Sequence, residues 1–285
     1  MKLVLKNTDG FTSSRLNAFL KEEPCLDTAW HYHPEYELLY ISRSSGIRFV
    51  GDNVSHFEPG DLVLVGSNLP HLWRNDVSYY SADSKKTIKT VVVKFYQDFI
   101  GDNTFEAPQF AAIKRMLSDS KYGMSFGKSV SIALKDELLS FPTLNNTQQY
   151  ISLLDILHKL SMVNDKQLLS SSDMRQYTPK GAKRIDRVIR HISDNYAKDI
   201  SLENISDIAC MTPNSFCRFF KKKTNKSFSE FLNEIRIRNA SRILIQEDFP
   251  INDICFLVGY NSITNFNKQF KKIMGRTPNQ YRQAV

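Results

Sequence analysis

The sequence predicts a multidomain α+β protein, with an all-β unit first, a helical region second and an all-α unit last. Three successive residue patterns along the 285 residues support this prediction. Short runs rich in Tyr, Val, Leu and Ile alternate with turn signals, then apolar residues recur at helical spacing, and helical spacing returns after a Ser-rich stretch. At roughly 150 residues per domain, a chain of this length is expected to form about two domains.

Composition narrows the class of protein. Charged residues make up 24% and hydrophobic residues 41% of the chain, which favours a globular fold over disorder. No apolar run reaches 18 residues, and the first ten residues lack the apolar core of a signal peptide. The four cysteines form no CxxC pair, which argues against a zinc finger and a disulfide scaffold. We therefore expect a cytoplasmic protein with reduced thiols and no membrane partner.

The first predicted domain, residues 1–106, is the β-rich unit. From residue 28 to about 100, short apolar runs are separated by the turn sequences SRSSG, GDN, EPGD and GSNLP. The segment TAWHYHPEYELLY carries its densest polar chemistry. Alternation along an extended strand would place four polar side chains of this segment on one face, namely His31, His33, Glu35 and Glu37.

A helical region and a linker are predicted to follow the β unit. In residues 107–163 the apolar spacing fits three amphipathic helices. Their apolar stripes either mediate homodimerisation or pack against the outer wall of the β unit. We favour the homodimer, because linked copies bind neighbouring sites at high effective concentration. Residues 164–183 are polar and Ser-rich with Pro179 and Gly181, which is typical of a flexible linker.

The last predicted domain, residues 184–285, contains an internal repeat. The stretch ISDIACMTPNSFCRFFKKKTNKSF aligns with ICFLVGYNSITNFNKQFKKIMGRTP, which has one extra residue in its turn. Each copy has the pattern of a helix, a tight turn and a second helix. Thr212 with Pro213 after it begins the second helix of the first copy, and Asn261 or Ser262 begins that of the second copy.

The second helix of each copy separates an apolar face from a polar face. Phe216, Phe219 and Phe220 form the core stripe of the first helix, and Phe266 and Phe270 form that of the second. The outward amides, hydroxyls and cations suit base edges in a major groove, and the lysine runs suit phosphates. The alternative is an ordinary solvated face, which two copies in one basic domain make less favourable. The residues expected to contact DNA are Thr212, Asn214, Cys217, Arg218, Lys221, Lys222, Ser262, Thr264, Asn265, Asn267, Lys268 and Lys271.

Net charge is distributed unevenly along the chain. The whole chain carries a formal charge of +8, yet residues 180–285 hold 19 basic and 10 acidic residues, whereas the first 179 hold 19 basic and 20 acidic. The excess positive charge therefore lies in the last third of the sequence. A basic domain is attracted to polyanions, so the charge supports nucleic acid as the partner of this domain.

Residues 201–282 carry a resemblance to a known family. The segment SLENISDIACMTPNSFCRFFKKKTNKSFSEFLNEIRIRNASRIL, followed by INDICFLVGYNSITNFNKQFKKIMGRTPNQYR, resembles the DNA-binding domain of AraC/XylS bacterial transcription regulators. The resemblance implies two helix-turn-helix motifs joined by a long helix over residues 228–246, and RNA polymerase as a partner. Two positions depart from the family pattern: Cys210 stands where a turn glycine is frequent, and Asn225 stands where the next loop often has glycine.

The β unit resembles a second family. HxHxxxE in TAWHYHPEYELLY and PHxxxN in PGDLVLVGSNLPHLWRN are similar to the two cupin motifs. The resemblance implies a barrel with metal ligands at His31, His33, Glu37 and His71, a set that would suit zinc, manganese, iron or nickel. The alternative is that these residues bond one another or a polar effector, without any metal cofactor. Aromatic side chains that would stack on a sugar or aromatic effector are Trp30, Tyr32, Tyr36, Tyr40, Phe49 and Trp73.

Together the patterns predict a sequence-specific DNA-binding transcriptional regulator rather than an enzyme, with activation favoured over repression. Its cupin-like barrel would bind a small-molecule effector such as a sugar, its helical region would support a homodimer, and its all-α domain would bind duplex DNA and contact RNA polymerase. Two alternatives remain open. One is a metal-dependent cupin enzyme, an oxygenase or isomerase, with an added nucleic-acid module. The other is a DNA binder without an effector, whose barrel serves only as a dimer scaffold.

Overall fold

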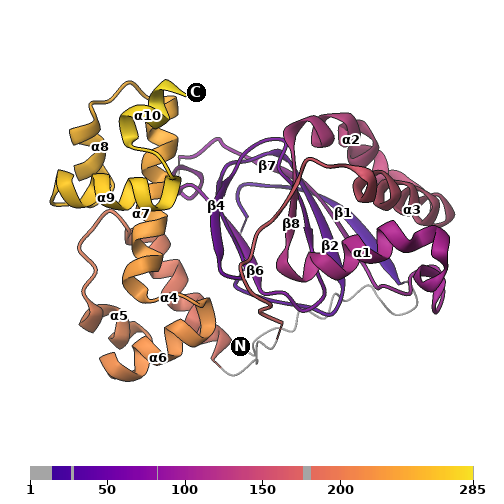
Figure 1. Ribbon diagram of the computed structural model, residues 1–285, viewed down its shortest axis with the longest axis horizontal. Helices are drawn as coiled ribbons and strands as arrows, with labels where there is room; N and C mark the ends of the chain where they lie inside the picture. The colour runs from indigo at the N-terminus through magenta and orange to yellow at the C-terminus, as the bar shows by residue number, and fades with distance from the viewer. Residues whose placement is uncertain (1–14, 27–28, 82, 176–180, 285) are drawn as a thin grey trace. The chain divides into compact units, whose positions relative to one another are not determined.

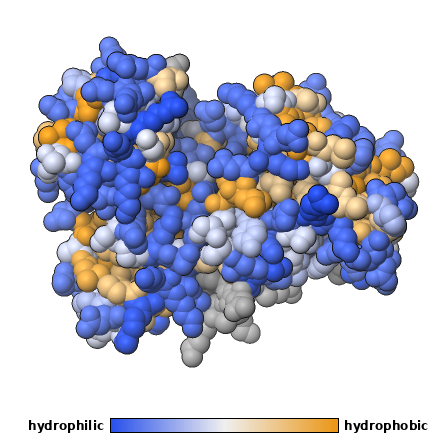
Figure 2. Space-filling view, in the orientation of Figure 1, coloured by the Kyte–Doolittle hydropathy of each residue, from blue (hydrophilic) through white to orange (hydrophobic). Residues whose placement is uncertain are grey.

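The computed structural model describes residues 15–26, 29–81, 83–175 and 181–284, and the chain divides into two compact units, residues 1–180 and 181–285. The first unit contains the strands and three α-helices, and the second unit contains seven α-helices among the residues described (Figure 1). No helix within the described residues combines the length and apolar character needed to cross a membrane. The surface visible in Figure 2 is mostly hydrophilic, with separate hydrophobic patches.

Two sheets form the β part of the first unit. The six-stranded sheet has the order β1-β7-β2-β5-β8-β9, and the three-stranded sheet has the order β4-β3-β6. Neighbouring strands pair antiparallel throughout. In chain order the strands are β1 (Leu16–Glu23), β2 (Tyr36–Arg43), β3 (Gly46–Val50), β4 (Asn53–Phe57), β5 (Leu62–Val65), β6 (His71–Asn75), β7 (Ile88–Phe95), β8 (Met124–Phe126) and β9 (Lys166–Leu168).

The described strands do not close into one barrel, which corrects the expectation of a closed cupin-like barrel. His31 forms an isolated bridge with His71 of the three-stranded sheet, whereas β2 pairs within the six-stranded sheet. The chain bends at Pro34 between these two pairings. Proline has no backbone N–H to donate and restricts the residue before it, so one continuous ladder cannot run through this segment.

The six-stranded sheet buries both of its faces. One face carries Leu38 and Val91 and packs against helices that include Met116, Leu138 and Leu157 (Figure 1). The helices of this layer are α1 (Ala111–Asp119), α2 (Lys128–Ser140) and α3 (Asn146–Met162). The short 3₁₀ segments are η1 (Val77–Tyr79), η2 (Thr104–Glu106), η3 (Pro108–Phe110), η4 (Ser120–Tyr122) and η5 (Phe141–Thr143).

The other face of the six-stranded sheet packs against the three-stranded sheet. Leu39 and Val92 of the larger sheet lie in one apolar cluster with Val50, Phe57 and Trp73 of the smaller sheet. Adjacent residues on a strand point to opposite faces, so Leu38 and Leu39 serve two different cores. The buried stripes of α1 to α3 are thus occupied within the chain, and a homodimer would have to use other surfaces.

Residues 166–172 belong to the first unit, which corrects their assignment to a flexible linker. β9 pairs with β8, and the Ser170 hydroxyl donates to Oδ1 of the buried Asp52 carboxylate at 2.9 Å. The backbone N–H of Ser171 donates to the same oxygen at 2.8 Å. Serine hydroxyls that the composition assigned to a solvated segment therefore satisfy a buried charge. Residues 176–180 of the predicted linker lie outside the described part of the chain.

The second unit is built from helices, as predicted. The expected long helix over residues 228–246 is α7, and its N-terminus has a capping box in which the Ser227 hydroxyl accepts from the Glu230 N–H. The ring of Phe216 lies 6.1 Å from that of Phe228, and Phe220 lies 5.2 Å from Phe231. The helices of this unit are α4 (Ala182–Asn195), α5 (Leu202–Ile208), α6 (Pro213–Thr224), α7 (Phe228–Gln246), α8 (Ile251–Leu257), α9 (Ile263–Met274) and α10 (Pro278–Gln283).

The two copies of the repeat share their backbone turns. Cys210 and Gly259 occupy matching turn positions with φ of +50° and +91°, and Asn225 and Gly275 end the following helices with φ of +58° and +74°. These are left-handed conformations that glycine adopts most easily and that asparagine tolerates. The departures from glycine at Cys210 and Asn225 therefore leave the turn geometry of the first copy intact.

Candidate nucleic-acid interface and buried histidine cluster

α6 and α9 each present a polar face and bury an aromatic one. Phe216 and Phe220 of α6, and Phe266 and Phe270 of α9, are fully buried. Each helix thus leaves the opposite side to solvent, as the helical spacing predicts. All twelve residues predicted to contact DNA are exposed: Thr212, Asn214, Cys217, Arg218, Lys221, Lys222, Ser262, Thr264, Asn265, Asn267, Lys268 and Lys271.

Both helices begin at the residues that the sequence indicates. Thr212 is the N-cap of α6 with Pro213 at the first helical position, and its hydroxyl donates to Ser215 Oγ at 3.1 Å instead of capping a backbone N–H. Ser262, rather than Asn261, is the N-cap of α9 and accepts from the Asn265 N–H at 3.4 Å. The first residues of both helices therefore have definite orientations.

Lysines gather at the C-terminal ends of both helices. Lys221 and Lys222 end α6 as exposed cations, and Lys271 and Lys272 do so in α9. Cations are favoured there by the negative end of the helix dipole. Lys223 differs from the predicted lysine run: it is buried beside the phenylalanine stripe, and burial with neighbouring Lys222 lowers its pKa. It is thus part of the interior and unsuited to a phosphate.

Cations outside the predicted lysine runs were missed by the sequence reasoning. Lys226 lines a groove of about 430 Å³ beside α7 and α9, together with Lys272 of the predicted run, and Lys226 pairs with Glu234. On α4, Lys183 is exposed and the Arg184 guanidinium lies 5.8 Å from the Phe219 ring of α6. The repeat begins after α4, so alignment of the two copies could not find this helix. The excess of positive charge in the last third of the chain was the one sequence signal that could have indicated these cations.

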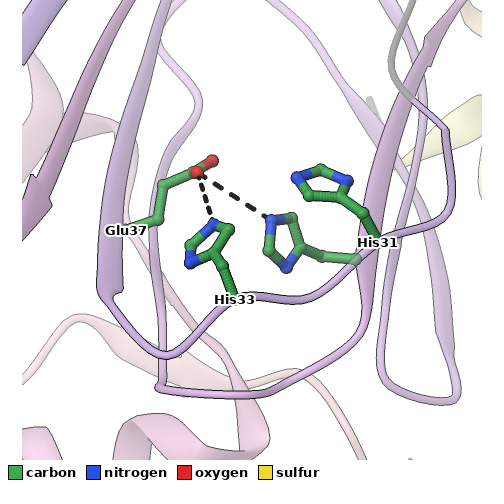
Figure 3. A group of neighbouring side chains, drawn as sticks. His31, His33 and Glu37 are labelled. Atoms are coloured by element: carbon green, nitrogen blue, oxygen red, sulfur yellow. Dashed lines mark hydrogen bonds and ion pairs between the residues drawn. The ribbon is translucent and has the colours of Figure 1, made fainter. Parts of the chain in front are cut away.

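The first unit brings together the four residues predicted as metal ligands. One ligand atom from each of His31, His33, Glu37 and His71 lies within 4.8 Å of the others. In Figure 3 the His33 ring and the Glu37 carboxylate face each other, and His33 Nε2 lies 3.0 Å from Glu37 Oε2. His71 Nε2 lies 3.9 Å from the same oxygen. The cluster lies where the segment before β2 meets β6 through the isolated bridge between His31 and His71.

Backbone carbonyls orient the three rings of the cluster. Nδ1 of His31 donates to the Ala29 carbonyl at 2.7 Å, and Nδ1 of His71 donates to the Leu69 carbonyl at 2.8 Å. Nδ1 of His33 lies 3.1 Å from the backbone carbonyl oxygen of Glu35. A hydrogen bond from Nδ1 leaves Nε2 as the ring atom that faces a ligand, the arrangement common for metal-binding histidines.

Lys94 is a further member of the cluster that the sequence reasoning missed. Its ammonium lies 3.1 Å from Glu37 Oε2, and its side chain is buried. Lys94 of β7 stands directly opposite Glu37 of β2 in the antiparallel register. That pairing joins strands separated by four other strands in the sequence, so a motif confined to one segment could not indicate it.

Glu35 does not join the predicted set. Its carboxylate lies 3.3 Å from His33 Nδ1, on the ring edge away from Glu37, and it accepts from the Tyr96 hydroxyl at 3.3 Å. The bend at Pro34 breaks the extended alternation on which the prediction depended. Glu35 is therefore a neighbour of the cluster and lies outside its centre.

Burial and charge set the protonation of the cluster. Burial alone would raise the pKa of Glu37, yet the Lys94 ammonium and the hydrogen bond with His33 hold it well below its usual range. Burial opposes protonation of His33, but its hydrogen bonds to two carboxylates raise its pKa. Burial lowers the pKa of His71 to about 4 and also lowers that of His31. The cluster thus combines the Glu37 carboxylate, the Lys94 side chain, the His33 imidazole, which favours the cationic form, and the two neutral imidazoles of His31 and His71.

The donors fit a divalent transition metal in type and in ring orientation. Ligands of a tetrahedral ion stand about 3.4 Å apart, so the cluster would have to contract slightly. A metal would also have to displace the proton between His33 and Glu37. The Glu37 carboxylate would then contact both the metal and the Lys94 ammonium. The same groups without a metal offer donors and acceptors to a polar ligand.

Comparisons with known proteins bear on the second unit most directly. Residues 205–284 match the family described as a helix-turn-helix domain. The bifunctional transcriptional activator/DNA repair enzyme AdaA of Bacillus subtilis is 32% identical over 99 residues, covering 35% of this chain and 47% of that protein. The chain thus covers less than half of this relative's length.

Two further similarities extend the comparison. An uncharacterised HTH-type transcriptional regulator of Haemophilus influenzae is 24% identical over 248 residues, covering 81% of this chain and 80% of that protein. The C-terminal domain of AraT, a response regulator from Geobacillus stearothermophilus, is 31% identical with a TM-score of 0.35, covering 36% of this chain and 85% of that chain. Both sequence relatives carry the name of a transcriptional regulator, and AdaA is in addition named a DNA repair enzyme.

Proposed function

We propose that the protein is an AraC-type transcriptional regulator that binds duplex DNA through α6 and α9 and activates transcription in response to a small-molecule effector. The observation that carries the proposal is the repeated helix pair, in which both second helices expose polar side chains flanked by lysines. A cytoplasmic homodimer that contacts RNA polymerase completes the proposal.

The long helix supports simultaneous use of both faces. α7 has 19 residues and therefore extends about 28 Å at 1.5 Å per residue. Helix-turn-helix units that bind one face of DNA are spaced by about 34 Å, one helical turn. Residues at both ends of α7 pack against the two helix pairs, since Phe228 contacts Phe216, and Leu244 shares a core with Phe266. α7 thus serves as the spacer between two recognition helices.

Different residues are assigned to base and phosphate contacts. Arg218 presents a guanidinium that can pair with guanine in bidentate fashion, and Asn265 and Asn267 present amides that suit adenine. The Cys217 thiol is a weak donor, so the second helix pair and Arg218 would carry more of the direct readout. Lys222 and its counterparts in α9 would bind phosphates without reading sequence.

The first unit is proposed as a cupin-like sensor. Its buried cluster offers imidazole, carboxylate and ammonium groups to a polar effector such as a sugar, with or without a divalent metal at His31, His33, Glu37 and His71. An effector acts on DNA binding only if it favours one arrangement of the protein over another. The described stretch of residues 166–175, bonded to the first unit and leading toward the second, is the covalent route for that influence.

The experiment is a titration of the full chain with fluorescent duplex DNA at several salt concentrations, followed by selection of bound sequences from a random pool. We expect the logarithm of affinity to fall with the logarithm of salt with a slope of about −4 or steeper, because at least five cations would each neutralise a phosphate. The selected pool should converge on one motif. Binding that is absent, or insensitive to salt, would rule out the proposed function.

A further inference from the structure

A second polar pocket lies in the first unit, on the opposite face of the six-stranded sheet from the histidine cluster. It has a volume of about 260 Å³ and includes Tyr36 in its lining. Tyr36 packs with the helix-covered core, whereas its neighbour Glu37 points to the histidines on the other face. The pocket is therefore a separate site, formed by α1, η4 and the residues that follow β5 and β7.

Three cations line this pocket, and none of the carboxylates among the described residues lines it. The cations are Lys114 of α1, Lys121 of η4 and Arg175, which belongs to the segment before the second unit. Neutral hydrogen-bonding side chains complete the polar lining, namely Ser67, Gln97 and Ser118. A concave site with several cations and uncharged donors suits an anion, because each charged donor strengthens its hydrogen bond to an oxyanion.

The donors of these cations are only partly used by the protein. Arg175 donates through Nε and Nη2 to Asp173, at 2.9 and 2.6 Å, while Nη1 has no hydrogen-bond partner in the part of the chain that the structure describes. The Lys121 ammonium lies 5.0 Å from the Tyr122 ring centre and forms no ion pair with any described carboxylate. Lys114 pairs with Glu106 through one of its three donors. Asp173 thus holds the Arg175 guanidinium in place and leaves its Nη1 available to a ligand.

We propose that this pocket binds a small oxyanion, the carboxylate or phosphate group of a metabolite, between Arg175, Lys121 and Lys114. A planar guanidinium edge pairs with two oxygens of such a group, and the two ammonium groups neutralise its charge. Pockets for drug-sized ligands have volumes of about 300–1,000 Å³, so a pocket of about 260 Å³ suits a smaller metabolite.

The position of the pocket gives the ligand a route to the second unit. Arg175 is the last described residue of the first unit, and Gly181 begins the second. An oxyanion that joins Arg175 to α1 and η4 would fasten this connecting segment to the sheet. The inference rests on the proposed function for its regulatory meaning: it names a small anion as an effector that changes DNA binding.

The test is calorimetric titration of the full chain with sodium phosphate and, separately, sodium malonate, at constant ionic strength against sodium chloride. We expect saturable binding of at least one of the two anions. Lys121→Gln and Arg175→Gln should each weaken that binding by about tenfold or more, because each removes a charge-assisted hydrogen bond. Lys128→Gln is the matched control, since this exposed lysine pairs with Glu58 and does not line the pocket.

The outcomes separate the site from the proposed function. Binding of phosphate alone or of malonate alone would identify the class of oxyanion. Absence of saturable binding for both anions, or equal affinity in wild type, Lys121→Gln and Arg175→Gln, would overturn the inference. DNA titrations of the same proteins without added anion give an independent readout. Failure of wild type to bind DNA would contradict the proposed function, while the calorimetric result would still decide whether the anion site exists.

Discussion

Cys210 shows how far one residue can depart from a repeat while the backbone remains the same. It has φ of +50°, and its counterpart Gly259 has φ of +91°. A left-handed conformation costs an ordinary residue roughly 1–2 kcal/mol. Comparison with the pattern of the resembled family indicated this departure from the sequence alone. The retained turn could not be predicted, because packing of the helices on either side determines whether such strain is tolerated.

Cys210→Gly is expected to stabilise the protein by about 1 kcal/mol, because the strain is relieved while part of the gain is lost to the greater freedom of the unfolded chain. Urea unfolding of the full chain measures the change. Asn225→Gly is the matched control and should gain less, since asparagine tolerates φ of +58°. A Cys210→Gly protein no more stable than wild type would show that the turn is unstrained.

Arg218 and Lys222 lie on the same helix and are assigned different contacts. Arg218→Ala is expected to reduce discrimination between operator variants by about 1–3 kcal/mol at one base pair. Lys222→Ala should weaken binding to all sequences alike and reduce the salt slope by about 1. Competition titrations with single-base operator variants measure both. Equal loss across all sequences in Arg218→Ala would remove Arg218 from base readout.

The buried Glu37–Lys94 pair permits a test of the cluster. Lys94→Met is expected to destabilise the protein by about 3–5 kcal/mol, because it leaves the Glu37 carboxylate buried without its ammonium partner. Adding Glu37→Gln should restore much of that loss, since the unpaired charge is removed. Chemical unfolding at neutral pH in the presence of a chelator measures both proteins. A double variant as unstable as Lys94→Met alone would contradict this account of the pair.

At the scale of elements, periodicity predicted the type of each secondary-structure element well and its packing partners poorly. The helix start at Thr212 was predicted from its capping residue and the proline after it, whereas the long helix over residues 228–246 was predicted from the family resemblance. The β9 strand and the attachment of Ser170 to Asp52 were not predicted, because each depends on a partner distant in sequence. Composition alone assigned the serines to a linker.

Asp52 is expected to hold the segment that leaves the first unit. Asp52→Ala removes the acceptor for Ser170 and Ser171, which should cost about 2 kcal/mol locally and open residues 166–175 to proteases. Limited proteolysis with mapping of the cut sites measures the opening. Asp102→Ala, at an exposed turn, is the control. Cleavage of this segment at the same rate in both variants would show that Asp52 does not anchor it.

At the scale of the whole molecule, charge and fold divide at nearly the same place. The basic excess begins at about residue 180, and the second compact unit begins at Gly181. The sequence predicted the convergence of His31, His33, Glu37 and His71, whose motif positions lie on two segments. It did not predict Lys94, the open sandwich of sheets or the pocket at Arg175, since these arise from contacts between strands and helices that no single segment contains.

The central claim is that α6 and α9 bind adjacent major-groove segments on one face of DNA. The measurement that tests it most directly is guanine-methylation interference on a site selected by the full chain. The account predicts two major-groove segments, about one helical turn apart, in which guanine methylation blocks binding. Lys268→Ala should weaken interference in only one segment, and Arg218→Ala in only the other. A single segment of interference, unaffected by one of the two substitutions, would contradict the claim that both helices bind DNA.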